Sequence, residues 1–541
     1  MFVRQTIARG HTYLQIVQSY RENGKPRQKV VCSLGRMDAL QATGQMDDLV
    51  ASLAKYATKQ TWLDLRKDLS IERVYRLGAA HVVCRMMERL GLSAMFERLT
   101  AKHPRMRLPW TTILTGMMVS RFIRPCSKRR LNLEQWEQIY PGILEMKSPP
   151  LEGFYRSMDV LWKHRDDVES VLFDRGGRRD LFNQNLDVVF FDLTTLYFES
   201  VNDEDGVLRR FGYSKEHRND CTQVILGLLV DRDGVPVGYQ LFSGNTSEPK
   251  SLPTILENLK KRYPIEKVIL VADRGLVTQK NVGELKKAGM DFVLGMKLWT
   301  MSQSEQESVL DKSTYQALDK KGDVLIRETT HEGDRLVLTW SRTRAERDVH
   351  LREKVLERLE NQLTAGATAK RFVTHKGYRQ YLKGLDGGVP SLNESAVLES
   401  QKRDGFFGVL TSVPAERMSG SDVFARYHDL WHVEDAFGEI KGPLETRPMF
   451  HWVDQRIQSH TLLCLLSYYV ESVMIREFRK ADTNLTVGRW FRALNEIYAV
   501  PVDIQGSRAW VRNEIQGDAM EGYRIMGIRP PDRILKIEKT K

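Results

Sequence analysis

The sequence predicts an α/β fold in which helices flank a mixed β-sheet. Residues 188–191 and 268–271 are runs of four apolar residues rich in Val, Ile and Phe, which is typical of strands buried on both faces. Residues 221–244 predict two further apolar strands joined by Asp233-Gly234, a dipeptide that favours a tight reversal. Because helical periodicity then alternates with strand patterns, we expect three antiparallel strands followed by helix and strand pairs.

The length and composition indicate a globular chain of several domains. With 541 residues, of which 41% are hydrophobic, the chain can form roughly three or four domains with ample core. It carries 82 Lys and Arg against 70 Asp and Glu, a net charge of +12. Such an excess is expected of a chain that meets a polyanion, although many basic proteins bind none. Charge alone therefore leaves nucleic-acid binding open.

The cysteines and apolar stretches favour a cytoplasmic protein without a membrane span. The five cysteines are scattered and nowhere form a C-x-x-C pair, which argues against a disulfide framework and a zinc module. The apolar stretch from His460 is interrupted by Ser467 and Glu471, as in a core helix. The first residues carry charge throughout, unlike a signal peptide. We expect no membrane partner.

The first part of the chain predicts a hairpin and then helices. Asn23-Gly24 lies between two strand-like stretches and is a favoured two-residue hairpin turn. Apolar residues recur at three- and four-residue spacing over residues 74–92 and 110–122, which predicts two helices. A basic cluster follows around Pro125 and consists of Arg121, Arg124, Lys128, Arg129 and Arg130. Such a cluster is commonly a solvated helix end, but here it is the best local candidate for phosphate contacts.

After residue 245 the chain alternates between helices and strands. Ser247 can cap a helix, and Pro249 suits the first turn of that helix. Residues 268–273, 277–288 and 291–298 then predict a strand, a helix and a strand. A three-stranded meander followed by such pairs is the order of the RNase H-like fold. Residues 299–403 are more charged and include a helical pattern over residues 342–363; the segment is too long for a loop, so we expect an inserted domain.

Two aspartates follow the apolar strands in the same way. Asp192 comes directly after residues 188–191, and Asp273 follows residues 268–271 with Ala272 in between. An uncompensated buried carboxylate is costly, so each must cap a turn, pair with a cation or hold a metal. Functional groups of open mixed sheets gather at strand ends, where two such aspartates could bind a divalent ion. For Asp273, a cap ahead of Gly275 is the alternative.

We expect a third carboxylate, because a site for two oxygen-binding divalent ions requires more oxygen ligands than two aspartates supply. An apolar stripe predicts an amphipathic helix further on and consists of Leu430, Val433, Phe437 and Ile440. Tyr427, Glu434 and Lys441 fall at intervals of seven and so line one flank of that helix. A surface heptad of polar residues is the alternative, because Glu and Lys are common on exposed helices.

Together these residues resemble the DDE transposases of bacterial insertion sequences, in the group named after insertion sequence four. The family motifs are D-x-T, A-D-R-G and, after an inserted β-rich domain, Y-x2-R-x3-E-x6-K. The matching positions are Asp192-Leu193-Thr194, Ala272-Asp273-Arg274-Gly275, and Tyr427, Glu434 and Lys441. The resemblance covers roughly residues 185–475 and implies an RNase H-like catalytic core, with Asp192, Asp273 and Glu434 as catalytic metal ligands.

The resemblance implies a metal-dependent reaction on DNA. Two Mg²⁺ ions, with Mn²⁺ as a substitute, would support in-line cleavage of a phosphodiester and then strand transfer. Lys441 would neutralise a phosphate near the scissile bond, and Tyr427 would position the DNA backbone. The implied partners are the terminal inverted repeats of the element, target DNA and a second protomer in a synaptic complex. The implied location is the bacterial cytoplasm, with the nucleoid.

One position departs from the family pattern, because Leu430 stands where the signature has Arg. The phosphate contact of that Arg is therefore unassigned. His432 lies on a different side of the predicted helix, and Arg447 and Arg426 are equally plausible substitutes. Some relatives stack a flipped base on an aromatic ring, for which Trp299 is a candidate; a Trp packed at a domain junction is the better interpretation.

The resemblance divides the chain into five segments. Residues 1–184, with the hairpin and the basic cluster, would bind the DNA ends. Residues 185–298 and 404–480 would form the two parts of the catalytic core, and residues 299–403 the inserted domain. Residues 481–541 would form a C-terminal region that is a candidate for dimerisation.

Three rival readings differ from this one in the sequence features they need. Haloacid-dehalogenase phosphatases need a second Asp two residues after the first, where this chain has Thr194. A nucleotide-driven motor needs a G-x4-G-K-[ST] loop, which the sequence lacks. A transposase descendant that binds DNA without cutting it stays an alternative: the three carboxylates favour activity, and Leu430 favours its loss.

Overall fold

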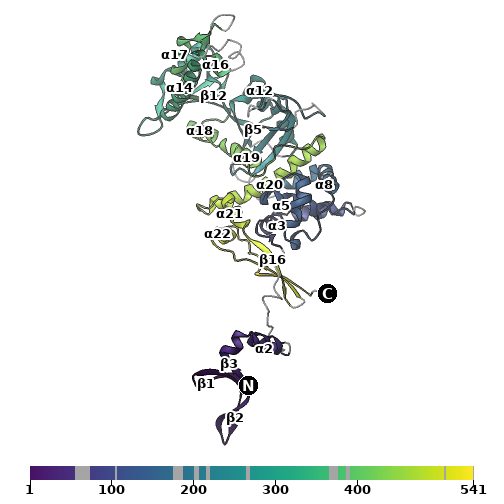
Figure 1. Cartoon of the computed structure of the whole chain (residues 1–541). Helices are drawn as coiled ribbons and strands as arrows, with labels where there is room; N and C mark the ends of the chain where they lie inside the picture. The colour runs from purple at the N-terminus through teal and green to yellow at the C-terminus, as the bar shows by residue number, and fades with distance from the viewer. Residues whose placement is uncertain are drawn as a thin grey trace. The chain divides into compact units, whose positions relative to one another are not determined.

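The computed structural model describes residues 1–54, 56, 73–103, 107–174, 187–199, 206–214, 218, 220–262, 268–364, 376–384, 390–504 and 507–539. The chain divides into two compact units. The first contains residues 1–75, 498–514 and 531–541, and the second contains residues 76–497 and 515–530. Figure 1 shows the chain from the N-terminus in purple to the C-terminus in yellow.

The first unit begins with a three-stranded antiparallel sheet. Its strands are β1 (Phe2–Ala8), β2 (His11–Glu22) and β3 (Lys25–Arg36), and two helices follow, α1 (Met37–Ala42) and α2 (Gln45–Ala54). The expected turn at Asn23-Gly24 is present, with φ angles of 50° and 77°, the positive values that a tight hairpin turn requires. A four-stranded sheet of order β18-β17-β16-β4 is also present, with β4 (Tyr75–Arg76), β16 (Tyr498–Ile504), β17 (Ser507–Arg512) and β18 (Ile534–Lys539).

The second unit begins with a group of helices. These are α3 (Gly78–Arg89), α4 (Leu92–Ala101), α5 (Trp110–Ile123), α6 (Lys128–Arg130), α7 (Pro141–Leu144), α8 (Leu151–Lys163) and α9 (Arg165–Asp174). Helix α5 confirms the helix predicted over residues 110–122. Helix α3 confirms the helix predicted over residues 74–92, but it is shorter at both ends. Nearly all of α5 is buried, because α3 and α8 pack against it.

A nine-stranded mixed sheet forms the centre of the second unit. Its spatial order is β10-β11-β12-β15-β9-β8-β5-β6-β7. The strands are β5 (Asp187–Tyr197), β6 (Gln223–Val230), β7 (Pro236–Ser243), β8 (Val268–Ala272), β9 (Asp291–Gly295), β10 (Gln316–Ala317), β11 (Val324–His331), β12 (Asp334–Ser341) and β15 (Phe406–Thr411). The pairs β5–β8 and β8–β9 are parallel and the others antiparallel. The α/β class, the meander and the mixed sheet are as the sequence predicts.

Helices cover both faces of this sheet. Leu252 and Ile255 of α11 (Glu248–Arg262) and Leu285 of α12 (Gln279–Lys287) share a core cluster with Phe191 and Leu193 of β5. The residues of β5 that precede and follow Phe191 and Leu193 point to the opposite face of the sheet, because side chains alternate along a strand. On that second face, α19 (Trp431–Lys441) packs against β5 and β6, and α18 (Gly420–His428) packs against β8 and β9.

Strands from residues 299–403 join the same sheet. Strand β12 pairs with β15, and β15 pairs with β9, so the sheet continues from the predicted core into the predicted insertion. The long charged helix is also present as α14 (Arg342–Thr364). The remaining elements there are α13 (Gln303–Leu310), α16 (Lys376–Arg379), β13 (Leu382–Lys383), β14 (Ser391–Leu392) and α17 (Glu394–Lys402). The domain boundaries set out above stay a prediction.

The prediction of a single amphipathic helix across Tyr427, Glu434 and Lys441 is wrong, because the chain forms two helices there. Tyr427 lies on α18, whereas Glu434 and Lys441 lie on α19. Between them, the backbone N–H of Leu430, His432 and Val433 bonds to the carbonyl three residues earlier. Such tight turns advance about 120° per residue rather than 100°. Tyr427 therefore leaves the seven-residue alignment.

Helix α20 (Asp454–Lys480) runs through the second unit and packs against α5, α8, α19 and β7 (Figure 1). Its centre, from His460 to Met474, is buried, as the sequence predicts for a core helix. Helices α21 (Val487–Leu494) and α22 (Gly517–Met526) pack against it. None of the helices in the described residues is both long and apolar enough to span a membrane.

Candidate active site

Asp192 and Asp273 lie at the same level of two neighbouring strands. The parallel register of β5 and β8 ends with Phe191 opposite Ala272, and each aspartate is the next residue. Neighbouring strands are roughly 4.8 Å apart, so the two side chains emerge next to each other at the end of β8. Both aspartates are partly exposed. The convergence of the two acids expected at strand ends thus has a direct cause in the sheet register.

Strand β5 does not end at Asp192, contrary to the sequence expectation. It continues to Tyr197, paired with β6 only, after β8 has stopped at Ala272. Asp192 therefore stands where β5 loses its parallel neighbour. Since residues alternate between faces, Asp192 shares the face of Phe190, whose ring lies 5.8 Å from that of His432 on α19. Asp192 thus faces the layer that contains the Glu434 helix.

Asp273 is held by a tyrosine from α18. The hydroxyl of Tyr427 donates a hydrogen bond of 2.8 Å to Oδ1 of Asp273. The phenol also lies over Gly295 of β9, where an added Cβ would be 2.5 Å from its oxygen. Burial, with a smaller contribution from Asp273, raises the pKa of Tyr427 above its usual range. The phenol therefore stays a donor throughout the physiological range and orients the carboxylate.

Two arginines surround this tyrosine. Arg274 and Arg344 both act on the pKa of Tyr427, and the guanidinium of Arg344 lies 4.3 Å from the centre of the Phe407 ring. The Tyr427 ring packs on the same Phe407 at 5.0 Å. Burial lowers the pKa of Arg344, but arginine remains charged in proteins. Sequence reasoning missed Arg344, because it lies on α14 in the segment treated as a separate domain.

Glu434 lies on α19, the helix that packs over β5 and β6. It is exposed in the first turn of that helix, while Val433, Phe437 and Ile440 are buried as the predicted stripe requires. In the part of the chain that the structure describes, no three His, Cys, Asp or Glu side chains lie close enough together to hold a metal ion. The structure therefore aligns the two aspartates, and Glu434 does not form a three-residue group with them.

The donor set nevertheless fits a hard divalent cation. Carboxylate oxygens are the ligands that Mg²⁺ prefers, and Asp192 and Asp273 supply them from fixed strand positions. Tyr427 takes one oxygen of Asp273, which leaves the other oxygen for a ligand. Strand positions also keep the two carboxylates in a defined relation, as a metal site requires.

Comparison with family models agrees with this geometry. A model described as a transposase DDE domain matches residues 185–469, more than half of the chain. The chain belongs to the DDE transposase family. A second model, described as the N-terminal domain of the IS1634 family transposase, matches residues 3–63. No curated protein matches the chain. The protein is thus a transposase of the insertion-sequence type, and its narrower placement near insertion sequence four stays a prediction.

The candidates for the missing signature arginine lie in different surroundings in this transposase. Leu430 is 8% exposed and belongs to the apolar layer. Arg426 is exposed and pairs with Asp429 at 3.2 Å. The half-buried ring of His432 packs near Phe190, and burial lowers its pKa. Because the ring of His432 is neutral and packs against Phe190, its surroundings are those of a core residue rather than of a phosphate ligand.

Arg447 lies beside the end of β5. Its guanidinium is 4.9 Å from the centre of the Tyr197 ring, and the N–H of Met449 donates to the carbonyl of Tyr197. The segment after α19 therefore runs along the strand that carries Asp192. Because of this position, Arg447 stays a candidate for a DNA contact of the transposase. Lys441 lies in the last turn of α19 and is partly exposed.

The side chain of Trp299 packs against other side chains of the protein rather than being available to stack on a DNA base. Its ring meets the Phe406 ring edge-on at 6.4 Å, and the guanidinium of Arg403 lies 5.1 Å from its centre. The ring also belongs to the periphery of the main core cluster. These contacts are those of the structural alternative, a Trp at the junction of two segments.

The basic cluster around Pro125 lies in the helical part of the transposase. Arg124, Arg129 and Arg130 are exposed, whereas Arg121 and Lys128 are buried. Arg121 donates to the carbonyl oxygens of Leu444 and Glu445, so it joins α5 to the segment that follows α19. The cluster is therefore not simply a solvated helix end.

Proposed function

We propose that this transposase binds the terminal inverted repeats of its insertion sequence and catalyses metal-dependent DNA strand cleavage and strand transfer. The single observation that carries the proposal is the level alignment of Asp192 and Asp273 on neighbouring parallel strands. Two carboxylates at one height on neighbouring strands can both contribute oxygen ligands to one divalent ion.

Glu434 completes the site in this proposal. Helix α19 packs over β5 and β6, and His432, two residues before Glu434, lies near Phe190, two residues before Asp192. Glu434 is therefore on the helix that covers the strand of Asp192. The carboxylate would join the two aspartates when DNA and metal neutralise the repulsion among the three acids.

The chemistry divides among the residues as follows. Divalent ions held by the carboxylates would activate water or a 3′-hydroxyl and stabilise the leaving oxygen. Tyr427 keeps Asp273 oriented through its hydrogen bond. Lys441 neutralises a phosphate near the scissile bond. Arg344, with Arg274, takes the phosphate contact left open by Leu430, since both cations adjoin Tyr427.

The partners follow from the same proposal. The unit that contains residues 1–75 would contact the repeat, since the matching N-terminal model covers residues 3–63. Cleavage of two ends in one synaptic complex calls for a homodimer, with residues 481–541 as a candidate interface. The transposase would act in the bacterial cytoplasm, with the nucleoid.

A nicking assay on supercoiled plasmid tests this function. With Mg²⁺ and both inverted repeats, the wild-type protein should nick at the repeat ends. Asp192→Asn and Glu434→Gln should reduce nicking about 1000-fold or more, as when groups that stabilise a transition state are removed. Asp435→Asn is the matched control, because Asp435 is the exposed acid next to Glu434. Nicking that survives Asp192→Asn would contradict the proposal.

A DNA-binding descendant without nuclease activity is the second candidate. The observation in its favour is the buried Leu430 at the position of the signature arginine. Such a protein would shift repeat DNA in a gel and leave the plasmid intact with either Mg²⁺ or Mn²⁺.

A further inference from the structure

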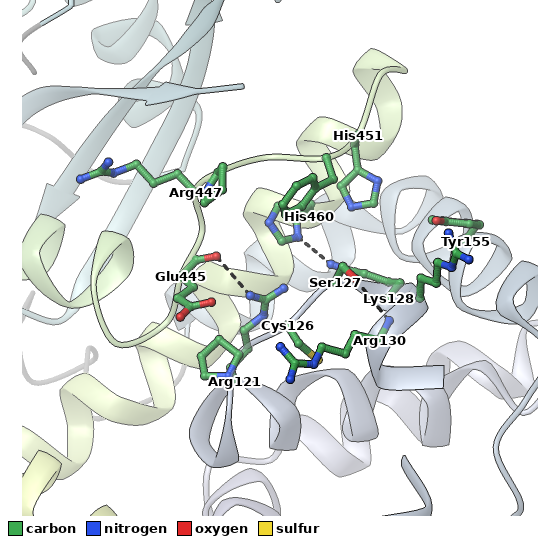
Figure 2. A pocket seen from close by; sticks show the side chains of 14 residues that line it. Arg121, Cys126, Ser127, Lys128, Arg130, Tyr155, Glu445, Arg447, His451 and His460 are labelled. Carbon is green, nitrogen blue, oxygen red and sulfur yellow. Dashed lines mark hydrogen bonds between the residues drawn. The ribbon is translucent and has the colours of Figure 1, made fainter. Parts of the chain in front are cut away.

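A cavity of about 480 Å³ lies beside the basic cluster. Its walls come from the end of α5, from α6, from α8, from the segment between α19 and α20, and from α20 itself (Figure 2). None of the three proposed catalytic acids lines it. The cavity is therefore a separate site in the second unit.

The lining of this cavity is strongly positive. Arg121, Lys128, Arg129 and Arg130 line it, and Glu445 is the one acid among the lining residues that the structure describes. The backbone carbonyl of Glu445, rather than its carboxylate, accepts the bond from Arg121. Arg447 also lines the cavity, but its guanidinium points away from Lys128 in Figure 2, toward Tyr197.

Lys128 is the unusual member of the lining. It is 5% exposed, and its ammonium lies 2.8 Å from Nδ1 of His460. Nε2 of His460 faces the carbonyl of Thr446 at 3.3 Å, so Nε2 carries the proton and Nδ1 accepts. The histidine is thus neutral, and its pKa is lowered well below the usual value, chiefly by burial.

The charge of Lys128 has no counter-ion within the described part of the chain. Its hydrogen bond to His460 uses one of three N–H donors. Burial, then Arg121, lowers the pKa of Lys128 to about 7. A buried ammonium beside a buried guanidinium is costly, and an apolar side chain would fill the space at less cost. An anion in the cavity would remove this cost, because it adds an opposite charge and accepts the free donors.

We propose that this cavity binds one phosphate group of a DNA strand, with Lys128 as its central ligand and Arg129 and Arg130 as exposed contacts. The assignment of the phosphate to DNA rests on the proposed function, whereas phosphate binding itself does not. Because the wall between α19 and α20 begins directly after the Glu434 helix, a strand held here would also fix the segment that follows α19.

Phosphate binding is tested on the full chain without DNA. Sodium phosphate should raise the midpoint of thermal unfolding of the wild type above its value in sodium chloride of equal ionic strength. Lys128→Met should lose the specific part of this increase, while the general stabilisation by phosphate salts persists. Lys287→Met is the matched control, since Lys287 is 76% exposed and pairs with Glu284; it should respond like the wild type.

DNA binding is tested with a duplex that contains the inverted repeat. Lys128→Met should weaken binding at least about ten-fold, the effect of losing a hydrogen bond to a charged group. It should also lower the slope of log affinity against log salt by about 0.9, one phosphate contact. Phosphate stabilisation lost without any change in DNA binding would assign the cavity to a free phosphate compound and overturn the assignment to DNA.

Two further measurements keep the result interpretable. If Lys128→Met does not fold, acetylation of the wild type followed by mass spectrometry decides: DNA should protect Lys128 and leave Lys287 reactive, and equal reactivity of Lys128 with and without DNA would overturn the proposal. Lys287→Met should bind DNA with the wild-type affinity and salt slope. A wild type that binds in this way but never nicks would refute the proposed function and leave the phosphate site standing.

Discussion

Asp273 is oriented by a neutral phenol rather than by a cation. The hydrogen bond from Tyr427 fixes one oxygen of the carboxylate without supplying a positive charge that would compete with a metal ion. Arg274 and Arg344 adjoin the same tyrosine, so positive charge lies close to the carboxylates without pairing directly with Asp273 in the described residues. This arrangement suits a site that receives both a divalent ion and a phosphate.

Replacing Tyr427 with Phe should lower nicking roughly ten- to hundred-fold, because a hydrogen bond to a charged group contributes about 1.5–3 kcal/mol. The unfolding midpoint should change little, since Asp273 is partly exposed and water can take the place of the hydroxyl. Tyr468→Phe is the control: its buried hydroxyl donates to the carbonyl of Gly234, so this variant should lose stability and keep its nicking rate. Full activity of Tyr427→Phe would show that the bond plays no positioning role.

The sequence predicts both aspartates, because an acid after an apolar run is visible without a structure. It does not predict the contacts that join distant segments. The bond between Tyr427 and Asp273, the proximity of Arg344 and the pair of Lys128 with His460 depend on how helices pack on the sheet. Local patterns contain no information on such packing.

At the scale of elements, the turn between α18 and α19 determines which residues can cooperate. It lets Tyr427 face β8 and β9 while Glu434 lies on a helix over β5 and β6. A continuous helix would place both on one flank, above a single strand. The seven-residue spacing predicts that flank correctly only while the backbone keeps α-helical geometry, and the three-residue hydrogen bonds at Leu430 and Val433 change it.

Helix α20 contains a buried acid whose titration should be measurable. Glu471 is 6% exposed, and its Oε2 lacks a hydrogen-bond partner in the described residues. Burial, with a contribution from Glu439, raises its pKa from 4.5 to about 8. The folded protein therefore binds more protons than the unfolded chain between these two values, so this group makes stability fall as pH rises through that window.

We expect the wild type to lose stability relative to Glu471→Gln as pH rises from 5 to 8. The free energy of unfolding of the wild type should fall by about 1.4 kcal/mol, relative to the variant, for each pH unit between the two pKa values. Thermal or denaturant unfolding of both proteins measures it, and the difference isolates Glu471 because Lys128 and the histidines are present in both. Parallel stability curves for the two proteins would contradict the assignment.

At the scale of the whole molecule, the sheet links the regions that the sequence separates. Residues 299–403 contribute β10, β11 and β12 to the sheet that contains the two aspartates, and α14 brings Arg344 to the Phe407 ring beside Tyr427. The sequence predicts the long helix of this segment. It does not predict that strands of the segment attach to β9 through β15, because edge pairing depends on long-range contacts.

The proposed chemistry requires Asp192, Asp273 and Glu434 to surround one metal site when DNA is bound. Iron-directed cleavage tests this directly: Fe²⁺ replaces Mg²⁺ in the complex with repeat DNA, ascorbate and peroxide generate radicals at the metal, and mass spectrometry maps the cut polypeptide. We expect cuts near residues 192, 273 and 434 that excess Mg²⁺ suppresses and that Asp192→Asn abolishes. Cuts near 192 and 273 with none near 434, or cuts elsewhere only, would contradict it.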